Sequence, residues 1–286
     1  MLQKILLFLF IGISSLAVAQ IKNENKFSLQ IDTLQLYKKN YQDSTKIKSY
    51  LDHIFDNFRT DIGNSIAICD YLYNRSKEIK NPSLMASANN IKGTIYALKN
   101  DFQNASKYYI EAAEQFEKIN KPYSTAMIYN NLGLMYNNTN NRKLALKYFE
   151  KGLKIAEEHK IDKAKALLYI NLTNLYISEG NLNAGLESAL KADKLCLKLG
   201  MEKEQAVNAN LTGAIYYYQS NFEKALEFYH LSHKLSKKSG DTHSEHIALN
   251  NIGEVMALQK NPEAIPTLKM PEDYFKSIKD YTNLQQ

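Results

Sequence analysis

The chain has 286 residues, enough for one large domain or two small ones, and its 44% hydrophobic and 23% charged residues exclude wholesale disorder. Only 11 glycines and 5 prolines are present, too few for the tight turns of a β-rich fold, so the composition favours helix. The net charge of +6 comes mostly from evenly spread lysines, without a basic run or an aromatic–basic motif, and nucleic-acid binding is not expected.

The N-terminal segment 1–19 differs from the rest of the chain. Lys4 is followed by the apolar stretch Ile5–Ile13 and by the small residues Ala17-Val18-Ala19. A charged start, an apolar middle and an A-x-A end are typical of a signal peptide, and the apolar stretch is shorter than the roughly 20 residues that span a bilayer. We therefore expect a signal peptide over 1–19 and a soluble protein in the periplasm or outside the cell. Membrane attachment would need a segment downstream of this sequence.

Residues 20–43 are expected to form a linker or a short leading helix. Beyond them, short polar breaks recur with a 40-residue period. They are Asn100-Asp101, Asn140-Asn141, Gly180-Asn181, Ser220-Asn221 and Lys260-Asn261, with Asp61 one step earlier. Asp and Asn side chains accept hydrogen bonds from the first backbone N–H groups of a helix, so each break predicts a helix start.

The positions around these breaks repeat as well. Small residues stand at Gly93, Gly133, Thr173, Gly213 and Gly253, and three positions later come Tyr96, Tyr136, Tyr176, Tyr216 and Met256. After each break follow Ala105, Ala145, Gly185 and Ala225, and then Tyr109, Phe149, Ala189 and Tyr229. Glycine costs a helix about 1 kcal/mol relative to alanine, so its recurrence indicates close packing of two helices.

These residues resemble the tetratricopeptide repeat, a unit of two antiparallel helices with small residues at their contact. The stretch Asn130–Glu158 is close to the family pattern, and the resemblance covers about Ser44 to Lys279. It implies an all-α fold, a right-handed α-α superhelix of about five to six helix-turn-helix repeats. The predicted units are 44–81, 82–121, 122–161, 162–201, 202–241 and 242–286. Their period exceeds the roughly 34 residues of the common repeat, as in the long-repeat members of the family.

The last unit is degenerate. Pro266 and Pro271 fall within its second helix, where proline removes hydrogen bonds and kinks the chain. The sequence stops at Gln286, where the first helix of another repeat would begin. An uncapped solenoid end exposes an apolar edge, so either a partner covers it or the chain is part of a longer protein, which is the favoured reading.

Asparagines form two columns at the 40-residue period. One holds Asn90, Asn130, Asn210 and Asn250, with Ile170 interrupting it, and the other holds Asn131, Asn171 and Asn251. The resemblance implies that this part of the first helix lines a concave groove. An amide carries donors and acceptors, so it can bind the backbone of an extended peptide. These seven residues are the candidate ligand-binding site, with a bond to the backbone of a neighbouring helix, or exposure to water, as the alternative.

Other constellations point less clearly to chemistry. His230, His233, His243 and His246 could hold zinc, but without the H-E-x-x-H spacing surface histidines are favoured and no metal is predicted. Cys69 and Cys196 stand more than three units apart, too far for a disulfide, so both are expected in the core. Phosphate-binding, dinucleotide-binding and nucleophile motifs do not occur, and neither an enzyme nor a cofactor is predicted.

The sequence therefore favours a protein- or peptide-binding module. By resemblance, it would be the extracytoplasmic sensing or scaffolding part of a bacterial signalling or envelope protein. The alternative is an architectural subunit of an envelope complex that uses its ends and convex face and takes no peptide.

Overall fold

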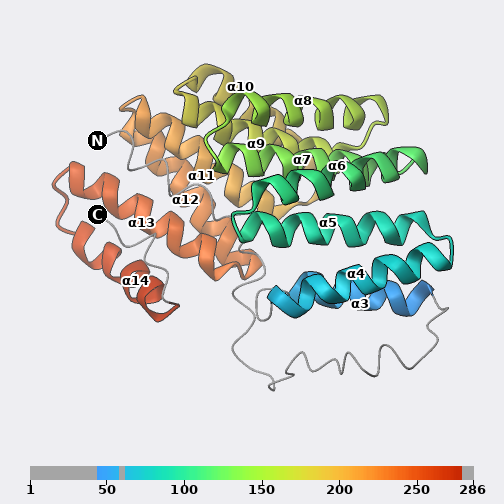
Figure 1. Cartoon of the computed structure of the whole chain (residues 1–286). Coiled ribbons are helices and arrows are strands. Elements are labelled where there is room, and N and C mark those ends of the chain that lie inside the picture. The colour runs from blue at the N-terminus through green and yellow to red at the C-terminus, as the bar shows by residue number, and fades with distance from the viewer. Residues whose placement is uncertain (1–43, 58–61, 279–286) are drawn as a thin grey trace. The chain divides into compact units, whose positions relative to one another are not determined.

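The computed structural model describes residues 44–57 and 62–278, and all regular structure in these ranges is α-helical. Figure 1 labels the described helices. The described chain divides into two compact units, one ending at Ala164 and one beginning at Lys165. The predicted signal peptide, the linker, the break at Asp61 and the end of the chain beyond residue 278 lie outside the described residues.

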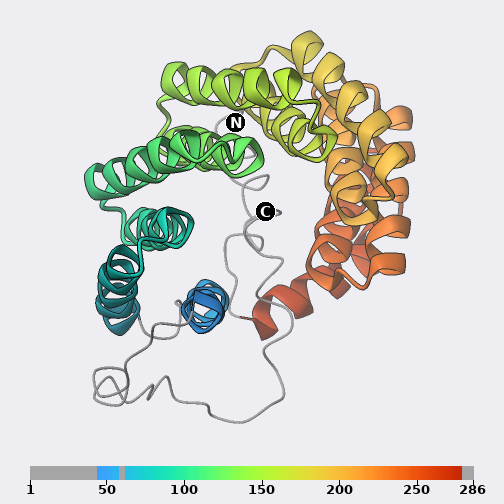
Figure 2. The same ribbon diagram turned by 90° about the vertical axis from the view of Figure 1, so that its right-hand side faces the viewer.

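The N-terminal unit contains the first six described helices. They are α3 (Ser44–Asn57), α4 (Ile62–Glu78), α5 (Pro82–Leu98), α6 (Phe102–Lys118), α7 (Pro122–Asn138) and α8 (Arg142–Glu158). Helices adjacent in sequence pack against each other, and α3, α5 and α7 also contact one another in order. The first helices of the pairs therefore form one layer and the second helices another (Figure 2).

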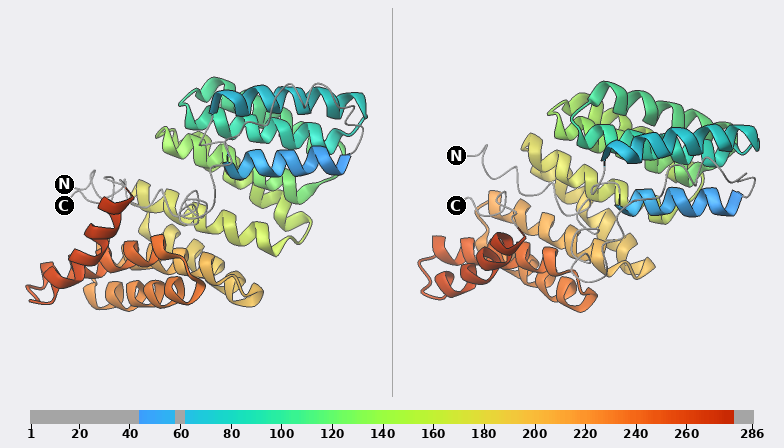
Figure 3. Two further views of the ribbon diagram at one scale, coloured as in Figure 1. Left: turned by 90° about the horizontal axis from the view of Figure 1, so that it is seen from below. Right: turned by 60° about the horizontal axis from the view of Figure 1, so that its bottom comes forward.

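The C-terminal unit repeats this plan. Its helices are α9 (Asp162–Glu179, of which the part from Lys165 lies in this unit), α10 (Leu182–Leu199), α11 (Glu202–Tyr218), α12 (Phe222–Ser239), α13 (Thr242–Leu258) and α14 (Ala264–Ser277). Here α11 contacts both α12 and α13, and α13 packs against α14 (Figure 3). The all-α architecture of consecutive helix pairs predicted from the sequence is confirmed.

The turns explain why the helices begin at even spacing. Each turn has a residue with positive φ, and these residues recur at 20-residue intervals: Lys80, Asn100, Asn120, Asn140, Lys160, Gly180, Gly200, Ser220, Gly240 and Lys260. The residue after it caps the next helix in most turns. Asn81, Asp101, Asn141, Asn181, Asn221 and Asp241 each accept a backbone N–H with their side chain.

One predicted helix start is wrong. Asn261 does not cap α14, which begins at Ala264 with Glu263 in the capping position. The side-chain oxygen of Asn261 instead accepts the N–H of Glu263 at 2.9 Å. The helix consequently begins later after its turn than the other second helices do after theirs.

The small and aromatic columns meet face to face. A Cβ built on Gly93, Gly133 or Gly213 would lie 2.5 to 2.6 Å from a ring carbon of Tyr109, Phe149 or Tyr229. The ring of each second helix therefore rests directly on the backbone of the first helix. Gly253 receives Leu268 of α14 in the same way.

The pair α9 and α10 departs from this pattern at both positions of the contact. Thr173 stands in the glycine column and Ala189 in the ring column, and both are buried. The larger residue on α9 is matched by the smaller one on α10, which conserves the combined volume that a close-packed interface requires.

Helix α14 runs from Ala264 to Ser277 and includes both prolines. Pro266 lies in the first turn, where a backbone N–H has no partner within the helix, so its absence costs little. Pro271 is inside the helix and buried, and the helix continues to Ser277.

The prediction that both cysteines are core residues is confirmed, since Cys69 and Cys196 are free and buried. Burial raises the pKa of each thiol to about 12.

We predict that Gly133→Ala lowers the free energy of unfolding by about 2–4 kcal/mol, because the added methyl group overlaps the Phe149 ring. Gly185→Ala is the matched control, since the closest atom to its Cβ would be a flexible Ile215 methyl carbon at 3.3 Å. This control should be neutral or stabilised by up to about 1 kcal/mol through helix propensity. Urea unfolding followed by circular dichroism measures both, and equal effects would contradict the packing argument.

Candidate functional site

The seven predicted asparagines all lie on first helices. Asn90 is on α5, Asn130 and Asn131 on α7, Asn171 on α9, Asn210 on α11, and Asn250 and Asn251 on α13. No strand or loop contributes to the set, so their positions relative to each other within a unit are set by helix packing alone.

Within each unit, asparagines of adjacent first helices are hydrogen-bonded. In the N-terminal unit Asn131 Nδ2 donates to Asn90 Oδ1 at 3.2 Å. In the C-terminal unit Asn251 Nδ2 donates to Asn210 Oδ1 at 2.7 Å. The same bond thus occurs at equivalent places in both units, and it joins the two predicted columns to each other.

Burial divides the seven residues into two groups. Asn130 and Asn171 are each 3% exposed and Asn210 is 8% exposed, so little of their surface can meet a ligand. Asn90, Asn131, Asn250 and Asn251 are half-buried and remain accessible. Each amide–amide bond uses one donor of one residue and one acceptor of the other, and a primary amide offers two of each.

The carboxyl group of Glu254, which was not predicted as a site residue, lies beside the asparagines of α13. Asn250 Nδ2 donates to Glu254 Oε1 at 2.6 Å, and Glu254 is half-buried. Burial raises the pKa of Glu254 to about 7, although the Asn250 hydrogen bond works in the opposite direction. The position alone could have indicated it, since Glu254 follows Asn250 by one helical turn.

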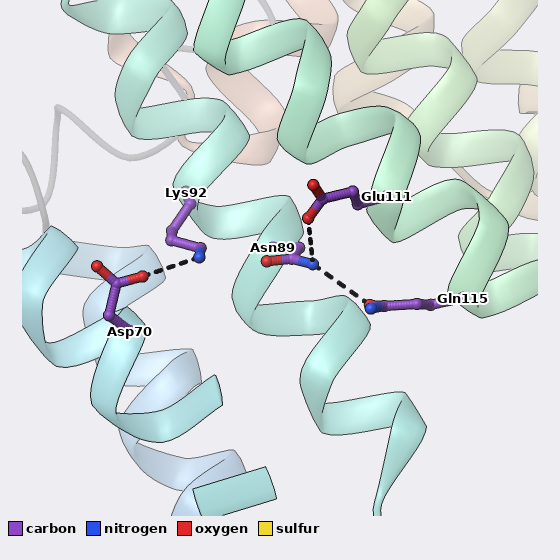
Figure 4. Close-up of polar contacts among 5 residues, drawn as sticks. All are labelled: Asp70, Asn89, Lys92, Glu111 and Gln115. Atoms are coloured by element: carbon purple, nitrogen blue, oxygen red, sulfur yellow. Dashed lines mark hydrogen bonds and ion pairs between the residues drawn. The ribbon is translucent and has the colours of Figure 1, made fainter. Parts of the chain in front are cut away.

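A second polar cluster joins α5 to its neighbours (Figure 4). The Lys92 ammonium lies 2.8 Å from Asp70 Oδ1 on α4 and 4.1 Å from the centre of the Tyr108 ring. Lys92 is 4% exposed, whereas the side chain of Asp70 is 53% exposed. A buried charge needs such partners because desolvation is costly. The equivalent positions on later first helices hold Leu132, Leu172, Thr212 and Ile252, all buried.

Asn89, on the same helix, faces α6. Its Nδ2 lies 3.3 Å from Glu111 Oε2 and 3.5 Å from Gln115 Oε1, as Figure 4 shows. The residue is fully buried, and its Oδ1 meets no hydrogen-bond donor among the described residues. This cluster links consecutive helices inside the packing, which indicates a structural role.

The histidines of α12 and α13 do not converge on one point. His233 Nε2 lies 3.5 Å from Glu245 Oε1, while the His246 ring stacks on Tyr274 with centroids 4.1 Å apart. His243 is buried against the Phe275 ring. Among the described residues no group of three or more His, Cys, Asp or Glu side chains could hold a metal ion. The zinc alternative therefore has no ligand set in this part of the chain.

The fold and the repeated glycine–ring contacts place the chain among the α-helical repeat proteins. Residues 84–158, about a quarter of the chain, match the family model described as the tetratricopeptide repeat, so this segment carries such repeats. No curated protein matches the sequence. None of the described helices is long and apolar enough to cross a membrane.

Solved structures of low sequence identity share the fold. BtubC from P. vanneervenii aligns with a TM-score of 0.64 at 17% identity, over 77% of this chain and 92% of that one. A signal transduction ATPase with a tetratricopeptide repeat sensor from Pyrococcus horikoshii aligns at 0.64 and 22% identity, over 84% of this chain but only 36% of that one. Aspartyl phosphate phosphatase F from Bacillus subtilis aligns at 0.64 and 13% identity, over 88% and 69%.

We predict that Lys92→Met leaves the free energy of unfolding unchanged or slightly higher, because an apolar side chain of similar length replaces a buried ion pair. Asp70→Asn should instead lower it by about 1–3 kcal/mol, since the buried ammonium then loses its carboxylate. Urea titration of both variants, with Lys107→Met as the exposed control, measures the difference. A larger loss for Lys92→Met than for Asp70→Asn would contradict this account.

The raised pKa of Glu254 predicts a pH-dependent stability effect. A carboxyl with a folded pKa near 7 and an unfolded pKa near 4.5 holds its proton more tightly in the folded state, so stability falls as pH rises between these values. Glu254→Gln removes this loss. The variant should match wild type near pH 4 and exceed it by about 3 kcal/mol near pH 8.

Urea unfolding at the two pH values tests the effect, with Glu223→Gln as a control that removes an exposed carboxylate from α12. If Glu254→Gln gained no stability near pH 8 relative to pH 4, the carboxyl would be ionised in the folded state at ordinary cost, and the site description would be wrong.

Proposed function

We propose that the chain is a protein- or peptide-binding module whose ligand lies along the asparagine-bearing face of the first helices within a unit. The observation that carries this proposal is the pair of amide bonds, Asn131 to Asn90 and Asn251 to Asn210. They place amides of neighbouring helices side by side, with donors and acceptors to spare. A row of primary amides is suited to the backbone of an extended peptide, which presents alternating N–H and C=O groups.

The finer parts of the proposal rest on the sequence. The chain would be a long-repeat, exported member of the tetratricopeptide repeat family, acting as the extracytoplasmic sensing or scaffolding part of a bacterial signalling or envelope protein. In support, the first helices α5 to α13 begin at constant spacing, at Pro82, Pro122, Asp162, Glu202 and Thr242. The fold is shared with a protein whose tetratricopeptide repeat portion is described as a sensor, and this chain spans about a third of that protein.

The same proposal assigns no catalytic reaction and no cofactor to the chain. The paired carboxylates Glu157 and Glu158 are exposed, as solvated charges on a helix surface are. Glu254 is the described carboxyl with the largest upward change in pKa, and it lies beside the asparagines, where a binding role accounts for it.

An architectural role is the second candidate, and exposed apolar side chains favour it. Leu190 and Leu197 on α10 are 63% and 62% exposed, and Ile265 on α14 is 80% exposed. Such side chains are typical of contacts with another protein. In that case the helix surfaces outside the asparagine face would carry the interaction.

Substituting the accessible amides distinguishes the two candidates. We predict that Asn131→Ala combined with Asn251→Ala weakens binding of peptides selected from a randomised hexapeptide library at least tenfold, since each lost hydrogen bond contributes about 1 kcal/mol. Asn183→Ala, at an exposed asparagine on the second helix α10, is the control and should bind as wild type does. Calorimetry with the selected peptides gives the affinities.

Retention of wild-type affinity in the double variant would overturn the asparagine face as the ligand site. Loss of association with a partner protein in Leu190→Ser and Ile265→Ser variants, with peptide binding unaffected by the asparagine changes, would establish the architectural role instead.

A further inference from the structure

Two large apolar side chains lie on the solvent-exposed side of the second helix α10. Leu190 and Leu197 are 63% and 62% exposed, and they stand two helical turns apart on one side of the helix. Two exposed charged residues continue that side, Glu187 one turn before Leu190 and Lys194 between the leucines. These four residues form the α10 stripe.

The leucine pair is particular to α10. On α6, α8 and α12 the positions equivalent to Leu197 hold the exposed charged residues Glu117, Glu157 and Lys237. None of these three helices has an apolar residue at the positions equivalent to both leucines. They form the same helix pairs with charge at these places, so packing within the chain does not require leucine. Aligned apolar side chains on an exposed surface are typical of a contact with another protein.

The charges of the stripe indicate which protein fits it. Glu187 lies in the first half of α10 and Lys194 in the second half. The Lys191 ammonium donates to Glu187 Oε1 at 2.7 Å, which uses one of the two carboxylate oxygens. A second α10 that runs in the opposite direction brings its lysine toward this glutamate and its glutamate toward this lysine. The stripe is complementary to itself, as a surface on a two-fold axis must be.

The leucines fit the same antiparallel arrangement. With the two-fold axis level with Ala192, residues equally far before and after Ala192 in the two copies lie level with each other. Leu190 of one copy is then level with Lys194 of the other, whose apolar stem covers it. Glu187 is level with Leu197 of the other copy, within one turn of that copy's lysine. The four leucines alternate along the contact at intervals of three or four residues, which is the spacing of packed helices.

We propose that the α10 stripe joins two copies of this chain in an antiparallel, two-fold helix pair. The contact buries four leucines and places Glu187 of each copy beside Lys194 of the other. One helix against one helix falls below the roughly 1,200 Å² of a stable interface, so the dimer is weak, with a Kd of about 0.1 mM. The inference does not depend on peptide binding, because α10 is a second helix and carries none of the seven asparagines.

Sedimentation velocity of the full chain, from about 10 µM to about 1 mM, measures this association. Leu197→Ser should raise the Kd at least tenfold, roughly the effect of losing two buried leucines at the contact, one from each copy. Glu157→Ser, at the equivalent exposed position on α8, is the matched control and should associate as wild type does. Both positions are exposed, and circular dichroism checks that each variant is folded.

Charge reversal tests the two-fold arrangement itself. Glu187→Lys brings lysines of the two copies together, and Lys194→Glu brings glutamates together, so each variant alone should associate at least about tenfold more weakly than wild type. An equimolar mixture of these two variants places lysine beside glutamate at both ends of the contact. The mixture should therefore recover the wild-type association.

The outcomes decide between a second copy and another occupant. Wild type that stays monomeric at about 1 mM overturns the pairing and leaves the leucines to a different protein. Association that persists in Leu197→Ser uses another surface and overturns it as well. A mixture of the charge variants that associates no better than either variant alone overturns the antiparallel arrangement. Loss of association in Leu197→Ser, together with recovery in the mixture, supports the proposal.

Discussion

The contact between a glycine of the first helix and a ring of the second helix sets the geometry of each pair. Gly93, Gly133 and Gly213 bear the rings of Tyr109, Phe149 and Tyr229, with no space for a Cβ between them. Each ring follows its glycine at the same sequence spacing, which accommodates the short turn. Successive residues of a helix point about 100° apart, so Asn131, two positions before Gly133, faces away from α8. The packing contact thus determines which face is left for the asparagines.

Much of this arrangement could be predicted from the sequence because it depends on local chemistry. Asp101, Asn141, Asn181 and Asn221 cap the helices that they were predicted to start. Asn261 does not, because α14 begins later and lacks the usual spacing to its partner helix. The position equivalent to the rings is Lys269, yet Leu268, one position earlier, meets Gly253. A column of similar residues identifies a repeat, but it cannot show that in one repeat the contacting residue is shifted by one position.

The candidate site was harder to predict, because a column of residues does not show how neighbouring helices are shifted along each other. The sequence columns align residues that are 40 apart, whereas the bonded asparagines are 41 apart in each unit. These neighbouring first helices are staggered by one residue, so each bond joins a residue of one column to a residue of the other. The stagger arises from side-chain packing between helices and leaves no mark in the spacing of the sequence. The sequence shows the two asparagine columns, but not which asparagines are bonded to each other.

Lys92 and Glu254 are charged residues in otherwise uncharged columns, and their surroundings treat the two charges differently. Lys92 replaces an apolar residue, and Asp70 and two tyrosine rings compensate its charge within the chain. The carboxyl of Glu254 is held by the neutral amide of Asn250, and its raised pKa shows that its surroundings disfavour the charged form. Folding thus stabilises the charge of Lys92 through its partners, whereas burial favours the neutral form of Glu254.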